Sequence, residues 1–269
     1  MIKLPLAESC RIRALIITRT NHRLMKKENL CKIISPFFLI LLWYAVAAII
    51  AAPLILPFPH TVLLRLFTLA QNSFFWKAFA FTFLRVIIAF LLSFIIGFFS
   101  GLLSADYPCF KDFIAFPLNI IRVTPIIAFI LLALFWFKSG TVPVVTGILM
   151  SLPVMISAAE KGFTKNRENQ EKLFKASCYG FTGFKAFRYI RLPAALPSLM
   201  AGAESVFGLC WKVVAAGEVL SIPRYGAGSL MQYSQLHLET ADTIAYTLAT
   251  IIFSYIGGKI IHKMIHFEP

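Results

Sequence analysis

The chain has 269 residues, of which 59% are hydrophobic and only 14% are charged, whereas soluble domains carry about 25% charged residues. A soluble core of this length could not bury so much apolar surface, so lipid must solvate much of the chain. The formal net charge of +14 would by itself suit a nucleic-acid partner. The Lys and Arg residues gather between apolar runs, however, which indicates membrane lipids rather than nucleic acid.

Six apolar segments approach or exceed the roughly 20 residues that cross a bilayer. These segments are Ile33–Leu56, Ala78–Ser104, Phe113–Phe137, Val142–Ala159, Ala194–Leu220 and Asp242–His262. The stretch 60–77 alternates apolar and polar residues, which favours an amphipathic helix at the outer interface. We therefore expect an all-α integral membrane protein with about six transmembrane helices, which form one transmembrane domain over residues 33–265.

The loops between these segments differ in positive charge. Residues 1–32 form a basic arm and the loop 160–193 is also rich in Lys and Arg, whereas 57–77 and 221–241 hold only three Lys or Arg residues between them. Positively charged loops stay on the cytoplasmic side of a membrane. Both termini are therefore expected in the cytoplasm, and the arm is expected to be a cytoplasmic extension separate from the transmembrane domain.

The basic loop 160–193 has the layout of a docking element. Its sequence predicts a short helix over Gln170–Tyr179, closed by Gly180, because glycine readily adopts the left-handed backbone of a helix C-terminus. A second helix is predicted over Phe184–Ile190, and Leu192-Pro193 begins the next span. Aromatic groups near this bend fit a partner groove. On physical grounds alone, an interfacial aromatic belt explains them equally well.

The spacing of this loop resembles a known signature. Gly180, nine residues, Ile190, one residue and Leu192-Pro193 match the signature loop of bacterial ABC importer permeases. Other pieces, in chain order, look like the nitrate/sulfonate/taurine-type subfamily: Leu56-Pro-Phe-Pro-His-Thr-Val62, Phe83-Leu-Arg85, Arg122-Val-Thr-Pro125, Leu192-Pro-Ala-Ala-Leu-Pro197, Trp211 with Glu218, and Gly226-Ala-Gly228. The resemblance covers roughly residues 35–265. The chain departs from the pattern at Phe174-Lys175, where the family usually has Glu-Ala.

This resemblance implies a type I permease fold with a cytoplasmic helix-Gly-helix coupling loop. It also implies a bacterial cell (inner) membrane, a second permease copy in a homodimer, a cytoplasmic ABC ATPase and an extracytoplasmic solute-binding protein. The docking residues that it implies are Ala176, Tyr179, Gly180, Phe181, Thr182, Phe184, Phe187, Ile190, Leu192 and Pro193. The coupling segment spans residues 168–193.

The chain itself is expected to be neither an enzyme nor a cofactor-binding protein. Its sequence has no Gly-x4-Gly-Lys-[Ser/Thr] loop, so ATP would be bound by the partner ATPase. The histidines and cysteines are dispersed, which argues against a metal cluster.

Charged residues within the predicted spans are the second functional signal. Each costs about 2.5–3.5 kcal/mol at mid-membrane on insertion scales, so each either lines a pathway or is paired within the protein. The candidates for the translocation path are Arg122, Glu204, Trp211, Lys212 and Glu218. For any single one of these residues, pairing within the protein is slightly favoured over a role in the pathway. Glu204 is the strongest pathway candidate because Gly202, Ala203 and Gly208 surround it with small residues.

Glycines and prolines in the spans predict local features of packing. Gly97 and Gly101 form a small-residue face that fits helix packing within one chain as well as between copies. Pro125 and Pro153 interrupt their spans and predict kinks.

Two other functions stay open on the residues alone. A stand-alone secondary transporter or channel would normally need more spans, or an inverted repeat with ionisable residues at the midplane. A membrane-embedded lipid-modifying enzyme would need clustered carboxylates, histidines or a metal motif at one interface. Neither pattern is evident in the sequence. Nitrate, sulfonates, taurine, bicarbonate and a vitamin precursor all fit as the solute of a permease.

Overall fold

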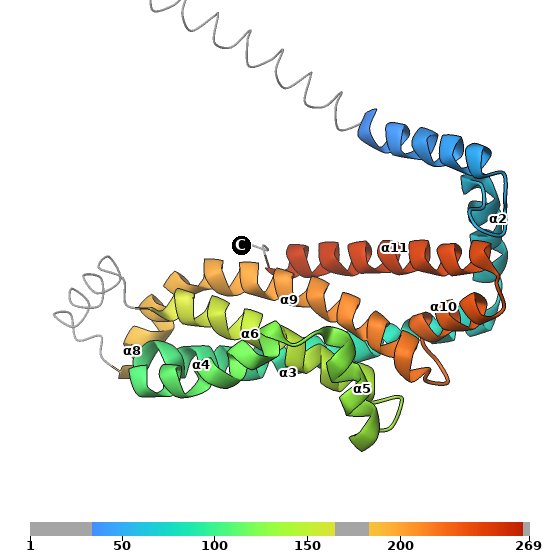
Figure 1. The fold of residues 1–269 in the computed structure, drawn as a ribbon. Coiled ribbons are helices and arrows are strands. Elements are labelled where there is room, and N and C mark those ends of the chain that lie inside the picture. Colours follow the sequence, from blue (N-terminus) through green and yellow to red (C-terminus); the bar gives the residue numbers. More distant parts are fainter. Residues whose placement is uncertain (1–33, 165–182, 266–269) are drawn as a thin grey trace, which may run out of the picture. The chain divides into compact units, whose positions relative to one another are not determined.

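The structure, a computed structural model, describes residues 34–164 and 183–265. Every regular element in these two stretches is a helix (Figure 1), which confirms the all-α class. Beyond a first helix at Ile34–Ile50, the elements are α2 (Pro59–Ala70), α3 (Ser73–Asp106), α4 (Pro108–Val123), α5 (Ile126–Trp136), α6 (Val142–Phe163), α8 (Gly183–Ala186), a π-helical turn (Phe187–Arg191), α9 (Leu192–Ser221), α10 (Ala227–Leu236) and α11 (Thr240–Ile265). The chain divides into two compact units, Met1–Leu63 and Leu64–Pro269. The predicted arm, residues 1–32, lies outside the described residues.

The first unit contains the helix Ile34–Ile50, which is shorter than the predicted span. The helix ends ahead of Pro53, because a proline removes a backbone donor and pushes the residue before it away from helical geometry. At about 25 Å the helix is slightly shorter than a 30 Å hydrocarbon core. Beyond the turn, the ring of His60 stacks on Tyr44, whose hydroxyl lies 3.1 Å from Nδ1 of the histidine.

The second unit begins within α2, which continues into the long helix α3. The predicted amphipathic stretch 60–77 is therefore not one helix but α2 followed by the first turn of α3. Asn72 separates the two by capping α3, since its side-chain oxygen accepts a hydrogen bond from the backbone N–H of Phe74 at 3.0 Å. Helix α3 has 34 residues and is about 51 Å long, so it exceeds the thickness of the hydrocarbon core.

The third predicted span, Phe113–Phe137, is not a single helix. It is broken into α4 and α5, whose axes differ in direction by 103°. The break lies at Thr124-Pro125, where Thr124 has the extended backbone (φ −71°, ψ 129°) that a following proline imposes. The kink predicted at Pro125 is thus a sharp bend, whereas Pro153 lies inside the continuous helix α6.

The remaining predicted spans are long helices. By length and composition, four described helices can cross a membrane: α3, α6, the helical run Gly183–Ser221, and α11. Counting the bent pair α4–α5 as one span gives five. The helix Ile34–Ile50 is also apolar but has only 17 residues. Each of the six predicted apolar segments therefore contains a helix, although the first helix is shorter than predicted and the third segment is a bent pair.

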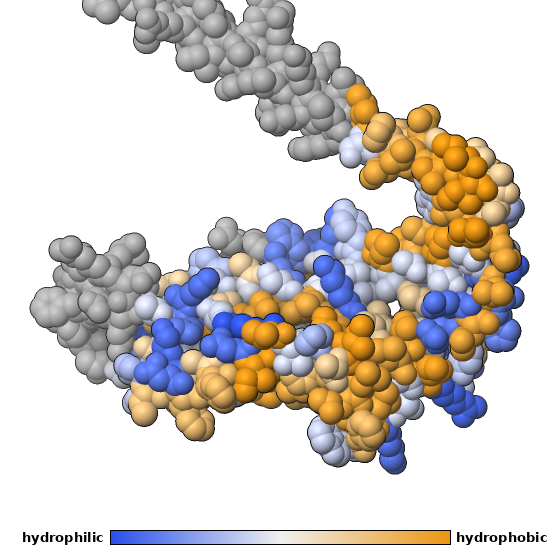
Figure 2. Space-filling view, viewed as in Figure 1, coloured by the Kyte–Doolittle hydropathy of each residue, from blue (hydrophilic) through white to orange (hydrophobic). Residues whose placement is uncertain are grey.

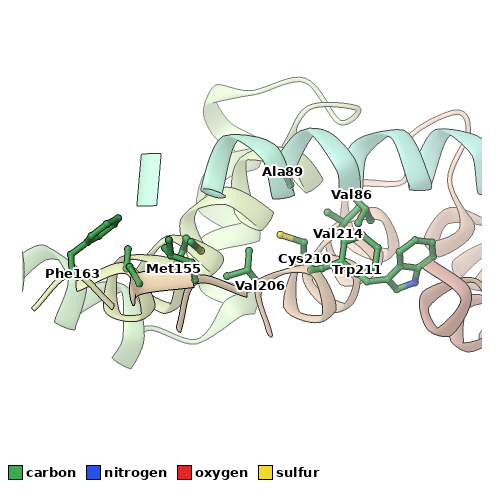
Figure 3. Packing of buried hydrophobic residues seen from close by; sticks show 12 residues of the cluster. Val86, Ala89, Met155, Phe163, Val206, Cys210, Trp211 and Val214 are labelled. Carbon is green, nitrogen blue, oxygen red and sulfur yellow. The ribbon is translucent and has the colours of Figure 1, made fainter. Parts of the chain in front are cut away.

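The core of the second unit lies where α3, α6 and α9 pack together. Side chains from the three helices meet there in one cluster (Figure 3), including Val86 on α3, Met155 on α6, and Val206 and Trp211 on α9. Because lipid tails are as apolar as these side chains, close van der Waals packing holds the three helices together here, rather than removal of apolar surface from water.

The glycines of α3 allow this close packing. A Cβ added at Gly97 would lie 2.5 Å from Cγ of Met155, and one at Gly101 would lie 2.8 Å from the carbonyl oxygen of Ile156. The small-residue face predicted on α3 therefore packs against α6 within the same chain.

Candidate translocation and coupling sites

A buried ion pair joins α3 to α9. Glu218 is fully buried, and its Oε1 accepts a hydrogen bond from Nη1 of Arg85 at 2.6 Å. The Arg85 guanidinium also donates to the carbonyl oxygens of Tyr225 (2.6 Å) and Gly140 (3.2 Å). One arginine on α3 thus holds two loops as well as the carboxylate.

The N-terminus of α10 completes this network. The backbone N–H of Gly228 donates to Oε2 of Glu218 at 3.0 Å, and the hydroxyl of Thr82 lies 2.8 Å from the same oxygen. The N–H of Ala227 donates to the Thr82 hydroxyl at 2.8 Å. A carboxylate at a helix N-terminus is favoured by the unpaired N–H groups and the helix dipole.

Close backbone approach explains the glycine at the start of α10. A Cβ on Gly228 would lie 2.7 Å from Cβ of Glu218 and 2.8 Å from the backbone nitrogen of Val219. Any larger residue would push α10 away from α9 and open the network. Of the two sequence-selected pathway candidates in this region, Glu218 is enclosed by these partners and Trp211 is buried in the core.

A pocket with both polar and apolar lining lies between α4, α6 and α9. It has a volume of 440 Å³, and its lining includes Arg122 from α4, Ser157 and Lys161 from α6, and Ser198 and Ser205 from α9. Nη2 of Arg122 donates to Oγ of Ser157 at 2.5 Å and to the carbonyl oxygen of Pro153 at 3.2 Å. Figure 2 shows hydrophilic residues interrupting the apolar surface at the end of the bundle where α4 and α6 lie.

The exposed face of α9 next to this pocket differs from that of α3. Residues Ala201, Ser205 and Lys212 are exposed on α9, with Gly208 half-buried between them. The exposed residues at helical spacing on α3 are Leu84, Ile88, Leu91 and Ile95. Large apolar side chains suit lipid, whereas small and polar ones suit water or a second protein surface. The α9 stripe is therefore less suited to lipid than this face of α3.

Glu204, the strongest pathway candidate from the sequence, pairs with α11. Its Oε1 lies 2.5 Å from Nδ1 of His262, and both side chains are partly exposed. The structure thus places Glu204 beside α11, while Arg122, Lys161 and Ser205 surround the pocket on another side of α9.

The predicted coupling loop is only partly described. Ala176, Tyr179, Gly180, Phe181 and Thr182 lie outside the described residues. The helix predicted over Phe184–Ile190 is present, but it runs without a break through the π-helical turn into α9, which makes one helical run Gly183–Ser221. Gly183 begins this run with φ +55°, a left-handed backbone that glycine adopts at little cost.

The aromatic residues of this end fall into two groups. Phe184 and Tyr189 are 75% and 64% exposed. Phe187 instead stacks on Phe163 at the end of α6, with ring centroids 6.0 Å apart and planes inclined by 22°. Ile190 and Leu192 are half-buried and Pro193 is exposed. Within the described part of the coupling segment, Phe184 and Tyr189 are therefore aromatic groups that are accessible to a partner.

A second ion pair fixes this end of the bundle. Arg191 donates from both terminal nitrogens to Asp106, at 2.8 and 3.0 Å, and its guanidinium lies 5.9 Å from the centroid of the Phe163 ring. Sequence reasoning did not select Asp106 or Arg191. The sequence does show an acidic residue, Asp106, just after a predicted span and on the same side of the membrane as the basic loop. Only the fold shows that its partner is Arg191.

The fold defines an all-helical protein in which four or five described helices are long and apolar enough to cross a membrane. Residues 93–264 match the family described as "binding-protein-dependent transport system inner membrane component". Because this match covers more than half of the chain, the protein belongs to that family. It is the permease subunit of an ATP-binding-cassette importer, as the signature of the 160–193 loop predicted.

Relatives from several organisms support this assignment. The chain is 23% identical to the taurine transport system permease protein TauC of Escherichia coli (strain K12) over 224 residues, which cover 81% of each protein. It is 25% identical to the putative ABC transporter permease protein MJ0413 of Methanocaldococcus jannaschii, over 86% of each. It is 22% identical to the putative aliphatic sulfonates transport permease protein SsuC of Bacillus subtilis (strain 168), over 84% of this chain and 80% of that one.

A solved structure supports the predicted fold. A chain of the MetNI methionine ABC transporter, in a crystal form titled as inward facing, superposes with a TM-score of 0.52 at 16% identity. The match covers 71% of this chain and 93% of that one. At this identity the likeness concerns the fold alone, and it agrees with a type I importer permease.

Proposed function

We propose that two copies of this chain form the solute pathway of the importer and that each docks a cytoplasmic ATPase through the 168–193 segment. ATP is bound by that ATPase, and the chain itself is neither an enzyme nor a cofactor-binding protein. An extracytoplasmic binding protein delivers the solute. The chain lies in a bacterial cell (inner) membrane with both termini cytoplasmic, as its loop charges favour.

The unbroken helical run Gly183–Ser221 carries this proposal. Its first turns present Phe184 and Tyr189 to a partner, and its later turns carry the small and polar stripe of α9. A helix of 39 residues is about 58 Å long, so one element reaches from the docking end to the far side of the bilayer. Displacement of Phe184 by the ATPase would therefore move the residues that line the pathway.

The pathway itself is proposed to follow the α9 stripe and the pocket between α4, α6 and α9 beside it. Arg122 and Lys212 are both exposed on spans of this chain, where contact with lipid would be costly. An aqueous path between two copies gives both side chains a polar environment. Glu204, Trp211 and Glu218 then act as supports of α9 rather than as solute contacts.

A small sulfonate is the proposed solute class. This proposal is supported by the names of two of the relatives above, a taurine permease and an aliphatic sulfonate permease, each matched over about four fifths of its length.

The substitution Phe184→Glu tests the docking role. A charge at this exposed position should abolish ATP-dependent uptake and co-purification of the ATPase, while membrane insertion and thermal stability stay unchanged. Tyr233→Glu is the matched control, since Tyr233 is also an exposed aromatic residue but lies on α10, away from the docking end. Uptake and ATPase binding that survive Phe184→Glu would refute the docking proposal.

A further inference from the structure

We propose that the pocket between α4, α6 and α9 is an anion-binding site in which Arg122 and Lys161 hold the oxyanion group of the transported solute. This inference rests on the proposed function and adds to it a defined site. Its first support is charge. The described lining of the pocket contains two cationic side chains and no acidic one.

The nearby carboxylates are engaged elsewhere. Glu160, next to Lys161 in the chain, pairs with Lys111 at 2.8 Å. Glu204, on α9, pairs with His262 at 2.5 Å. The pocket therefore keeps its positive charge, and two cations beside one pocket attract an anion more strongly than either does alone.

The second support is the free geometry of Arg122. Both hydrogen bonds that the described residues form with its side chain start from Nη2 and end on neutral oxygens, those of Ser157 and Pro153. A guanidinium has five N–H donors, so Nε and Nη1 still present donors from this side chain. Arginine binds oxyanions through pairs of such donors.

The third support is the size and position of the pocket. A volume of 440 Å³ falls within the range of about 300–1,000 Å³ that is typical of small-molecule sites. From Ser198 to Ser205 the pocket follows about 10 Å of α9. Ser205 also belongs to the α9 stripe, so the pocket opens onto the proposed pathway.

The site can be tested by its effect on a charged thiol reagent. We would replace Ser205 by cysteine in the full-length chain, with the five native cysteines substituted, and reconstitute it in phosphatidylcholine nanodiscs. The reaction rate with sulfonatoethyl methanethiosulfonate, an anion, is divided by the rate with its trimethylammonium analogue, a cation. This ratio reports the charge of the pocket.

Arg122→Gln and Lys161→Gln should each lower the ratio roughly tenfold, because each removes one nearby positive charge. Arg122→Lys, which keeps the charge, should preserve it. Lys77→Gln is the control, since Lys77 is an exposed cation on α3 outside the pocket. A ratio that does not respond to Arg122→Gln would overturn the proposal.

Protection of the cysteine distinguishes a solute from a lipid. Ethanesulfonate should slow the anionic reagent in the parent protein but not in Arg122→Gln. If ethanesulfonate gives no protection and phosphatidylglycerol in the nanodisc does, the site belongs to a lipid headgroup and the assignment to a solute is wrong. The assay needs no ATPase, so it succeeds or fails independently of the uptake experiment that tests the proposed function.

Discussion

The substitution Glu218→Gln should destabilise the protein strongly. The Glu218 side chain is fully buried and that of Arg85 is only 11% exposed, so the variant leaves a nearly buried guanidinium without its counter-charge. Breaking a buried pair in this way costs about 3–5 kcal/mol. In the native protein one carboxylate oxygen accepts from Arg85 and the other accepts from the N–H of Gly228. The glutamine amide replaces one of these oxygens by an NH₂ group, so a donor then faces a donor at that position.

Thermal unfolding of the purified protein in detergent measures this loss. A change of 1 kcal/mol shifts the midpoint by about 2–4 °C in chains of 150–250 residues, so the expected fall is about 6–20 °C. Lys111→Gln breaks a pair whose lysine is exposed to solvent, which screens the attraction, and it serves as the control with a much smaller expected shift. The double variant Glu218→Gln/Arg85→Gln should fall by less than the sum of the two single changes. Equal shifts in Glu218→Gln and the control would refute the view that the buried pair holds α3 to α9.

Three further substitutions test the packing of α3, the second ion pair and the proposed pathway. Gly101→Val should lower stability by about 1–3 kcal/mol, because the side chain would collide with α6, and thermal unfolding measures it. Asp106→Asn, which removes the charge opposite Arg191, should cost about 1.5–3 kcal/mol in the same measurement, and an unchanged midpoint would argue against this contact. Lys212→Met should reduce solute uptake without lowering the unfolding midpoint, because this side chain is exposed; a lower midpoint with intact uptake would contradict a pathway role.

The sequence predicted the helical segments well because their signal is local. Apolar length alone located the long helices α3, α6, α9 and α11. Local chemistry also shifted some boundaries, since Pro53 shortened the first helix and Asn72 placed the start of α3. The 103° bend at Pro125 was predicted in position but not in size, because the angle depends on what α4 and α5 pack against.

The sites depended on contacts between distant parts of the chain. Arg85 and Glu218 were both visible as charges within spans, yet their pairing across 133 positions is a property of the fold. Gly226 and Gly228 belonged to the family resemblance in the sequence. Only the structure shows that a side chain at position 228 would collide with α9. The pocket around Arg122 needed Lys161 and Ser205 from two other helices, and no spacing in the sequence brings these together.

The two arginine–carboxylate contacts between the long helices have a mechanical consequence. Arg85 meets Glu218 near one end of α3, and Asp106 meets Arg191 at the other. These junctions are separated by about 31 Å along α3 and about 40 Å along the helical run that contains α9. Two rods joined at such widely spaced points neither slide nor splay apart, so they tilt as one lever. Alternating access then has to come from joints outside this lever, and the break at Thr124-Pro125, where the axes of α4 and α5 differ in direction by 103°, lies outside it.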